Sequence, residues 1–400
     1  MNRTNLSPQL WIGCLAITVS VSLFTQAGIG VGLEYSLLSG IALLVWIRRA
    51  KSEPIPPRVV VYYLINIVSL LGLSTVRYAA HYGEFVQAQY PTLFQAHMAN
   101  TYSHWFLIQV CLPVCLLLVG GYLLIKQPAT GLFFALWGFL FCGLEALIQV
   151  GVELTQLTRY PHSYFLGVFI GIGQFLLSAW GLLTLAKSTP TSAVAQPIES
   201  MTTRRINLWS GLFVSFGAVY AITLYIQAGP LPVGVIIGSM MGGLIGWRKT
   251  TAHNSADPHK VAPLYLLLLA LFYGHVGEEV LTHFNRSIAA ISHHPWSDAE
   301  FEYLITLIGP LVWVFAGYSL WKRQAFGNFI LWFMIVGMIV GEPTHLLVFP
   351  VVRMVQEGVP YTYFSGMYTA LFPMIPAILA LGLILNDHKK TKQHPTSALS

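Results

Sequence analysis

Charged residues are scarce in this chain. Of 400 residues, 9% are charged and 55% are hydrophobic, whereas a soluble domain carries about 25% charged residues. A soluble protein of this composition would lack the polar surface that it needs. The excess of basic over acidic residues, 21 against 15, does not indicate nucleic-acid binding, because most lysines and arginines flank apolar segments. We therefore predict an all-α polytopic membrane protein.

Cysteine is also scarce and has no metal-finger spacing. The four cysteines all fall in apolar segments of the first half, so a disulfide framework is not expected. A cleavable signal peptide is not expected either. Only Arg3 precedes the first apolar stretch, and no clear cleavage site follows it, so we expect this stretch to be an uncleaved first span.

Apolar runs of roughly 17–25 residues, the length that crosses a bilayer, recur along the chain. Clusters of turn-forming and charged residues separate them, such as Lys51–Arg58 with its three prolines and the polar stretch Lys187–Arg205. Twelve spans are predicted, at residues 9–27, 31–47, 60–82, 104–125, 131–152, 163–186, 207–227, 231–247, 262–283, 302–321, 328–350 and 363–385.

The basic residues lie mostly on one side of this topology. With twelve spans both termini share a side, and all but four of the 21 lysines and arginines fall there. The four exceptions are Arg77, Arg159, Arg286 and Arg353. The positive-inside rule then predicts that both termini are cytoplasmic. The alternative, a miscounted pair of helices, would scramble this asymmetry.

Short motifs of the first half return in the second half at a nearly constant offset, close to half the length of the chain, which is typical of a tandem duplication. An even number of spans in each unit predicts two parallel six-helix repeats. The matching pairs are Gln26–Gly28 with Gln227–Gly229, Trp46–Arg49 with Trp247–Lys249, His81–Glu84 with His275–Glu278, Gly121–Lys126 with Gly317–Lys322, and Pro161–Phe165 with Pro360–Phe364.

Acids and histidines gather inside the predicted spans of the second half. An ionisable group costs about 2.5–3.5 kcal/mol at the centre of a span on insertion scales, so such groups indicate a site. His275 and Glu279 are four residues apart and share one helix face. Glu302 opens the next span, and Glu342 and His345 belong to the one after it. We predict that these residues converge on an intramembrane pocket.

The first half offers a depleted copy of this site. Its equivalents are His81, Glu84 and Glu145, but Phe85 stands where the second half has Glu279. The predicted ligand contacts are therefore those of the second half, in an apolar and aromatic lining that suits a lipid-like molecule. They are Glu278, Trp313, His345, Tyr363, Phe364, Tyr368 and Phe372.

Other interpretations of these residues stay open. Glu278 and Glu302 could face interfacial water, the aromatic residues could pack helices, and His275 with Glu279 could form a structural hydrogen bond. Glu342-x-x-His345 has the spacing of di-iron bundles, but those use two such units and only one is present. No metal or cofactor is therefore expected. Buried His and Glu also serve proton relays, so a proton-coupled transporter is a further alternative.

Residues 262–385 resemble the emopamil-binding protein family, also called the EXPERA domain. That family has four spans, with a His and an acid four residues later on the first, as in His275–Glu279. Ile308–Leu311 matches a Gly-Pro-Leu motif, Gly337–Glu342 matches Gly-x-x-x-Gly-acid, and Tyr363-Phe364 opens the last span. The first half fits the same frame more loosely.

Two such domains in one chain are similar to the transmembrane 6 superfamily. The resemblance implies EXPERA-like four-helix cores at 59–190 and 262–385. Pairs of helices precede them at 1–58 and 207–250, a linker covers 191–206, and a disordered tail covers 386–400.

The function implied by the resemblance is recognition of a sterol- or isoprenoid-like lipid. In a Δ8–Δ7 sterol isomerase, an acid such as Glu279, oriented by His275, would protonate a ring double bond. A base, Glu302 or Glu342, would then remove a proton elsewhere. The family's last span carries a Trp near the ligand, and here Phe372 and Met374 are the nearest candidates. A non-catalytic lipid-handling protein is therefore the alternative.

Overall fold

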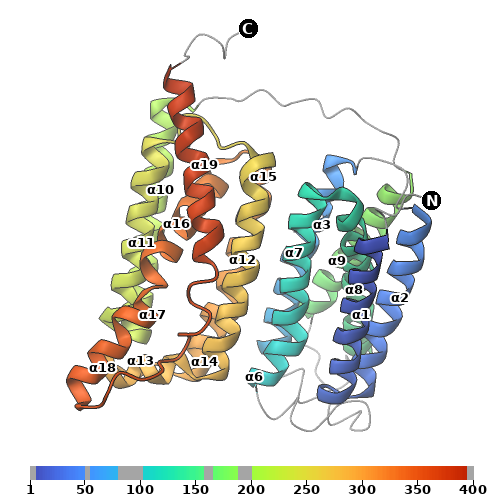
Figure 1. Ribbon diagram of the computed structural model, residues 1–400, viewed down its shortest axis with the longest axis horizontal. Coiled ribbons are helices and arrows are strands. Elements are labelled where there is room, and N and C mark those ends of the chain that lie inside the picture. The colour runs from blue at the N-terminus through green and yellow to red at the C-terminus, as the bar shows by residue number, and fades with distance from the viewer. Residues whose placement is uncertain (1–5, 50–54, 80–101, 157–164, 188–200, 394–400) are drawn as a thin grey trace. The chain divides into compact units, whose positions relative to one another are not determined.

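The computed structural model describes residues 6–49, 55–79, 102–156, 165–187 and 201–393. Figure 1 shows that these residues form helices, and no strand occurs in the described ranges. Ten of the described helices are long and apolar enough to cross a bilayer. The predicted class, an all-α polytopic membrane protein, is confirmed. The chain divides into two compact units, Met1–Ala193 and Val194–Ser400.

Unit 1 is a helical bundle centred on one long helix. This helix, α8, packs against α2, α3, α7 and α9. Its central part is almost entirely buried, because Phe, Trp and Leu recur on all its faces. The described elements of the unit are α1 (Leu6–Gln26), α2 (Ile29–Arg49), α3 (Pro57–Ala79), α6 (Tyr102–Trp105), the π-helix η2 (Phe106–Cys111), α7 (Leu112–Lys126), α8 (Pro128–Gln156) and α9 (Phe165–Ala186).

In unit 2 the described residues form long helices and several short ones, and Figure 1 shows the short helices α13, α14 and α18 at one end. α11 packs against α16, and α12 packs against both α15 and α19. The elements are α10 (Thr203–Ala228), α11 (Pro230–Lys249), α12 (Pro258–Leu281), α13 (Phe284–Ser292), α14 (Asp298–Phe301), the π-helix η3 (Glu302–Ile308), α15 (Gly309–Trp321), α16 (Ala325–Val336), the π-helix η4 (Gly337–Gly341), α17 (Thr344–Leu347), α18 (Phe349–Glu357) and α19 (Met374–Gln393).

The ten long apolar helices coincide with ten of the twelve predicted spans. The predicted first and last spans, 9–27 and 363–385, are not among them. The first corresponds to α1, in which the residues with described side chains form a shorter apolar helix, Leu10–Leu23. The last corresponds to α19, whose second half is polar.

The C-terminal region differs from its prediction at both ends. Residues 363–373 form turns rather than the start of a span, and α19 begins only at Met374. The helix then continues to Gln393, so residues 386–393 are not the disordered tail that their polar composition predicted. An ion pair supports this extension, because Lys260 Nζ lies 3.0 Å from Asp387 Oδ2.

The predicted linker 191–206 also ends earlier than expected. α10 starts at Thr203, because Thr202 acts as its N-cap and accepts a hydrogen bond from the backbone N–H of Arg205 at 3.4 Å. Hydroxyl side chains at this position satisfy one of the free N–H groups of a first helical turn. Residues 188–200 of this stretch lie outside the described residues.

Two tyrosines make the same hydrogen bond in the two units. Tyr63 of α3 donates to the carbonyl of Leu117 at 2.8 Å, and Tyr265 of α12 donates to the carbonyl of Trp313 at 2.8 Å. The first bond joins α3 to α7, and the second joins α12 to α15. The two tyrosines therefore provide equivalent positions from which the residues that follow in α3 and α12 can be compared.

Candidate functional site

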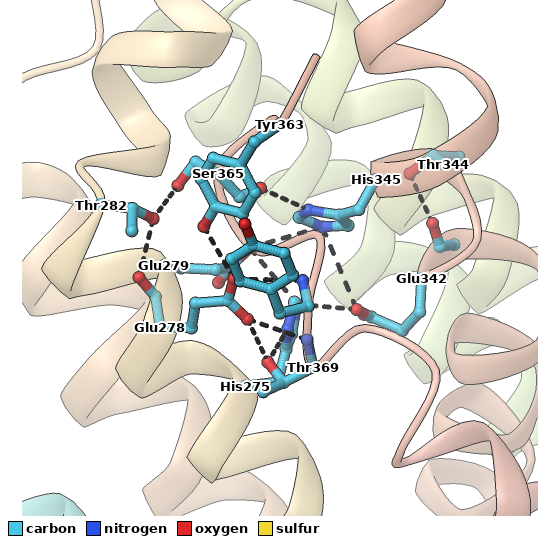
Figure 2. A network of polar contacts seen from close by, with 12 residues as sticks. His275, Glu278, Glu279, Thr282, Glu342, Thr344, His345, Tyr363, Ser365 and Thr369 are labelled. Atoms are coloured by element: carbon cyan, nitrogen blue, oxygen red, sulfur yellow. Dashed lines mark hydrogen bonds and ion pairs between the residues drawn. The ribbon is translucent and has the colours of Figure 1, made fainter. Parts of the chain in front are cut away.

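Four side chains meet in the interior of unit 2, and we call them the His/Glu cluster: His275, Glu279, Glu342 and His345. Figure 2 shows that they point toward one another. Between 1% and 8% of each residue is exposed, so water reaches none of them freely. His275 Nε2 lies 2.9 Å from Glu342 Oε2 and 3.7 Å from Glu279 Oε1. His345 Nε2 lies 3.5 Å from Glu279 Oε1 and 4.0 Å from Glu342 Oε2.

α12 supplies the first half of the cluster. His275 and Glu279 are one helical turn apart, so both face the same neighbours. Two hydrogen bonds fix this helix against α15 and η3: Tyr265 bonds to the carbonyl of Trp313 at 2.8 Å and Tyr273 to the carbonyl of Thr306 at 2.6 Å. The predicted pairing of His275 with Glu279 on one face therefore has a rigid frame.

Glu342 and His345 come from a break in the helix that α16 begins. The backbone N–H of Glu342 bonds to the carbonyl of Gly337 at 3.1 Å, five residues back, so the chain makes a π turn there. Pro343 then prevents the α-helix from continuing. A short turn follows, in which the N–H of His345 bonds to the carbonyl of Glu342 at 3.1 Å. The π turn and the proline together direct both side chains toward α12.

Residues 363–373, which we call the crossing loop, close the cluster from one side. Gly366 has φ +81°, a conformation that side chains with a Cβ rarely adopt. A Cβ at this position would lie 2.6 Å from His345 Nδ1 and 2.9 Å from His275 Cε1. Glycine is therefore required for the backbone to pass directly over both imidazole rings.

Glu278 holds this loop in place. Its carboxylate accepts four hydrogen bonds, from the Tyr363 hydroxyl at 2.7 Å, the Tyr368 N–H at 3.1 Å, and both the N–H at 2.9 Å and the hydroxyl at 2.5 Å of Thr369. Burial and the bond to Glu278 raise the pKa of Tyr363 above its usual value. Glu278 thus faces the loop rather than the interior of the cluster.

The outer nitrogen of each imidazole has a defined partner. His345 Nδ1 donates to the carbonyl of Ser365 at 2.9 Å. His275 Nδ1 lies 3.0 Å from the Thr369 hydroxyl, whose own hydrogen goes to Glu278. This hydroxyl must therefore accept from His275. Both rings consequently present Nε2, with its lone pair in the neutral form, to the centre of the cluster.

Two atoms at this centre lack a hydrogen bond. His275 Nε2 and Glu342 Oε2 are buried and, despite their short separation, make no hydrogen bond of acceptable geometry with any described residue. Buried polar atoms without partners are rare, and each calls for an explanation such as a bound ion or a catalytic role.

An apolar cavity of about 310 Å³ lies against the cluster, a volume at the small end of the range for ligand pockets. Glu279, Glu342 and His345 line it, whereas His275 lies behind them. Its remaining walls are almost entirely apolar and come from the helices α10 to α18, with the π-helices η3 and η4 and Trp296 between α13 and α14.

The predicted site residues fall into separate places. Besides three members of the cluster, only Trp313 of the predicted contacts lines the cavity. Glu302 begins η3 and lies outside the lining. Phe364 is buried against Phe284 and Phe349, with ring centroids 6.3 and 5.4 Å away. Tyr363, Tyr368 and Phe372 belong to the crossing loop and do not line the cavity, because this stretch is a loop and not the helix that the sequence predicted.

Several lining residues were missed from the sequence. α10 contributes Phe216 and Tyr220, and α11 contributes Val235. The six-helix repeat was the available signal, since it assigned these two helices to the same unit. Trp296, between α13 and α14, also lines the cavity, and its buried indole N–H donates to no acceptor among the described residues. Nothing in the pattern of spans could have placed this loop residue there.

Unit 1 has a different arrangement. Arg77 lies as far along the chain from Tyr63 as Glu279 lies from Tyr265, so the shared tyrosine bond aligns Arg77 with Glu279. Arg77 forms a buried ion pair with Glu145 and bonds to Gln149 at 2.7 Å. This register differs from the motif match that paired His81 with His275. His81 and Glu84 lie outside the described residues.

Comparisons of the sequence with family models, with curated proteins and with solved structures find no match. The fold and the site define the class directly. The protein is an integral, multi-pass, all-α membrane protein with a buried His/Glu cluster in its second unit.

Proposed function

We propose that unit 2 binds a sterol- or isoprenoid-like lipid in the apolar cavity, with the reacting part of the lipid against the His/Glu cluster. One observation carries this proposal: an apolar cavity of about 310 Å³ ends at three buried ionisable side chains. An apolar wall selects an apolar ligand, and a few converging polar groups orient it.

Access from the bilayer supports a lipid as the ligand. Phe216 lines the cavity, yet 51% of this residue is exposed on the outside of α10. In a membrane-spanning helix such a face contacts acyl chains. A lipid could therefore enter sideways past α10 without crossing the aqueous phase.

The cluster supports acid/base chemistry on such a lipid. Glu279 lines the cavity, and His275, which is not in the lining, places its Nε2 atom 3.7 Å from Glu279 Oε1. We infer that Glu279 delivers a proton to a ring C=C bond and that Glu342, the second carboxylate in the lining, takes a proton from a neighbouring carbon. The double bond then moves without any change in oxidation state. Glu302, the other predicted base, lies outside the lining.

The test has two readouts. Mass spectrometry of lipids that co-purify with the protein should find a sterol or isoprenoid, and a host lacking its own Δ8–Δ7 sterol isomerase should regain conversion on expression of the chain. Glu279→Gln should abolish conversion and retain the lipid. The amide has nearly the same shape as the carboxylic acid, but it is not acidic enough to protonate a C=C bond. Glu357→Gln, a change at an exposed glutamate outside the lining, should leave both unchanged.

The two readouts separate the parts of the proposal. If the wild type retains a sterol but converts none, the isomerase reaction is refuted, and the non-catalytic lipid-handling alternative stands. If no sterol or isoprenoid co-purifies and none can be loaded, the lipid-binding proposal itself is refuted.

A further inference from the structure

The three side chains His275, Glu342 and His345 have the arrangement of a metal site. One ligand atom from each lies within 4.8 Å of the others. Ligands bound to a single ion at about 2.0–2.2 Å in tetrahedral geometry lie roughly 3.3–3.6 Å apart. The Glu342 carboxylate is 2.9 Å from one imidazole and 4.0 Å from the other, so these two separations lie on either side of that range.

The hydrogen bonds around the two histidines orient them for this role. An imidazole that binds a metal typically donates its other N–H to a carbonyl or to a carboxylate, which fixes the ring and its tautomer. His345 donates to the Ser365 carbonyl, and His275 donates to Thr369, which itself donates to Glu278. Both Nε2 atoms are therefore the nitrogens left to bind an ion, and both lie within 4.0 Å of Glu342 Oε2.

The balance of charge points the same way. Glu279 and Glu342 are both buried, and within the described residues their only ion-pair partners are the two histidines. Burying carboxylates without compensating positive charge is costly. Unit 1 places Arg77 against Glu145 at the corresponding position, whereas the described part of unit 2 has no arginine or lysine in that place.

We propose that unit 2 holds a divalent transition-metal ion, of the zinc or iron(II) class, on His275 Nε2, His345 Nε2 and a Glu342 carboxylate oxygen. Two imidazoles and one carboxylate suit these ions. The ion also accounts for the two buried atoms without hydrogen bonds, His275 Nε2 and Glu342 Oε2.

Glu279 is not a ligand in this arrangement. Its Oε1 atom lies 3.7 and 3.5 Å from the two imidazole nitrogens and lines the cavity, so it stands beside the fourth coordination position. Catalytic sites with three protein ligands keep that position for water or substrate. Glu279 stays available for proton transfer, whereas an ion on Glu342 would occupy the carboxylate that serves as the base in the proposed isomerisation, so these two roles of Glu342 exclude each other. The metal proposal rests on the three ligands and does not depend on which lipid the cavity holds.

The experiment uses the full chain in detergent, stripped with a chelator, reloaded with zinc(II) or anaerobically with iron(II), and freed of excess metal. Elemental analysis should find about one ion per chain. Glu342→Gln and His345→Ala should lose it. His253→Ala and Glu357→Gln change exposed residues outside the cluster, and both should keep it.

A subtler variant guards against misfolding. Thr369→Val keeps the shape and the backbone N–H of residue 369 but removes the link between His275 and Glu278. Loss of such a supporting bond typically lowers metal affinity about 10–100-fold, which a zinc titration measures. The elution profile in size-exclusion chromatography should stay unchanged.

Failure of the wild type to bind either ion, or stoichiometric binding that survives Glu342→Gln, would overturn the metal site and leave His275 and Glu342 as an ion pair. Lipid content measured on the same samples reports separately on the proposed function.

Discussion

Replacing Gly366 by alanine tests whether the crossing loop shapes the His/Glu cluster. At φ +81° a residue with a Cβ costs about 1–2 kcal/mol. The new Cβ would also stand 2.6 Å from His345 Nδ1, so the ring or the loop must move. Loss of the bond from His345 to Ser365 would add about 0.5–1.5 kcal/mol. We expect Gly366→Ala to destabilise unit 2 by about 1.5–3.5 kcal/mol, on the sum of these two terms.

Gly358 provides a matched control, because it combines a similar conformation with open space. Its φ is +69°, and a Cβ there would meet nothing within 4 Å. Gly358→Ala should therefore cost only the backbone term, about 1–2 kcal/mol. The difference between the two variants isolates the contact with the histidines.

Thermal unfolding in detergent and retention of bound lipid and metal are the assays. Gly366→Ala should show the larger fall in midpoint and a loss of retention, whereas Gly358→Ala should retain both ligands at the wild-type level. Equal destabilisation together with equal retention would refute the claim that Gly366 is needed for the close approach to the rings.

Two further predictions concern single contacts. Arg77→Met should destabilise unit 1 by about 3–5 kcal/mol, because it leaves Glu145 buried and unpaired. Adding Glu145→Gln should recover most of this loss. Equal midpoints of thermal unfolding for the single and double variants would contradict this prediction. Trp296→Phe should reduce retention of lipids that carry a hydroxyl but not of their dehydroxylated analogues, since the buried indole N–H is a free donor in the lining; equal loss of both would show that only ring volume matters.

Much of the fold was predictable from hydropathy. Ten predicted spans coincide with long apolar helices, because about twenty consecutive apolar residues have few alternatives to a membrane helix. The C-terminal region was predicted wrongly, because hydropathy cannot distinguish an apolar helix from an apolar loop buried in protein. Residues 363–373 are apolar and aromatic, yet they form turns around Gly366.

The meeting of the cluster was only partly predictable. Helical spacing placed His275 and Glu279 on one face. The energetic cost of ionisable groups inside a span drew attention to Glu342 and His345. Their convergence depends on a π turn and on Pro343, which no periodicity in the sequence reveals. The roles of Glu278 and Thr369 depend on the path of the crossing loop and were equally hidden.

The π turn of η4 has a consequence for how such a site arises. A Cβ on Gly131 or on Gly327 would meet the backbone of the leucine seven positions earlier, Leu124 or Leu320, so the two glycines correspond. Glu145 follows Gly131 within the uninterrupted helix α8. Glu342 is separated from Gly327 by one residue more than Glu145 is from Gly131, and η4 lies between Gly327 and Glu342. One additional residue turns everything beyond it by about 100° around the helix axis. Removing one residue between Gly327 and Glu342 would therefore turn Glu342 and His345 by about 100° from their present direction toward α12.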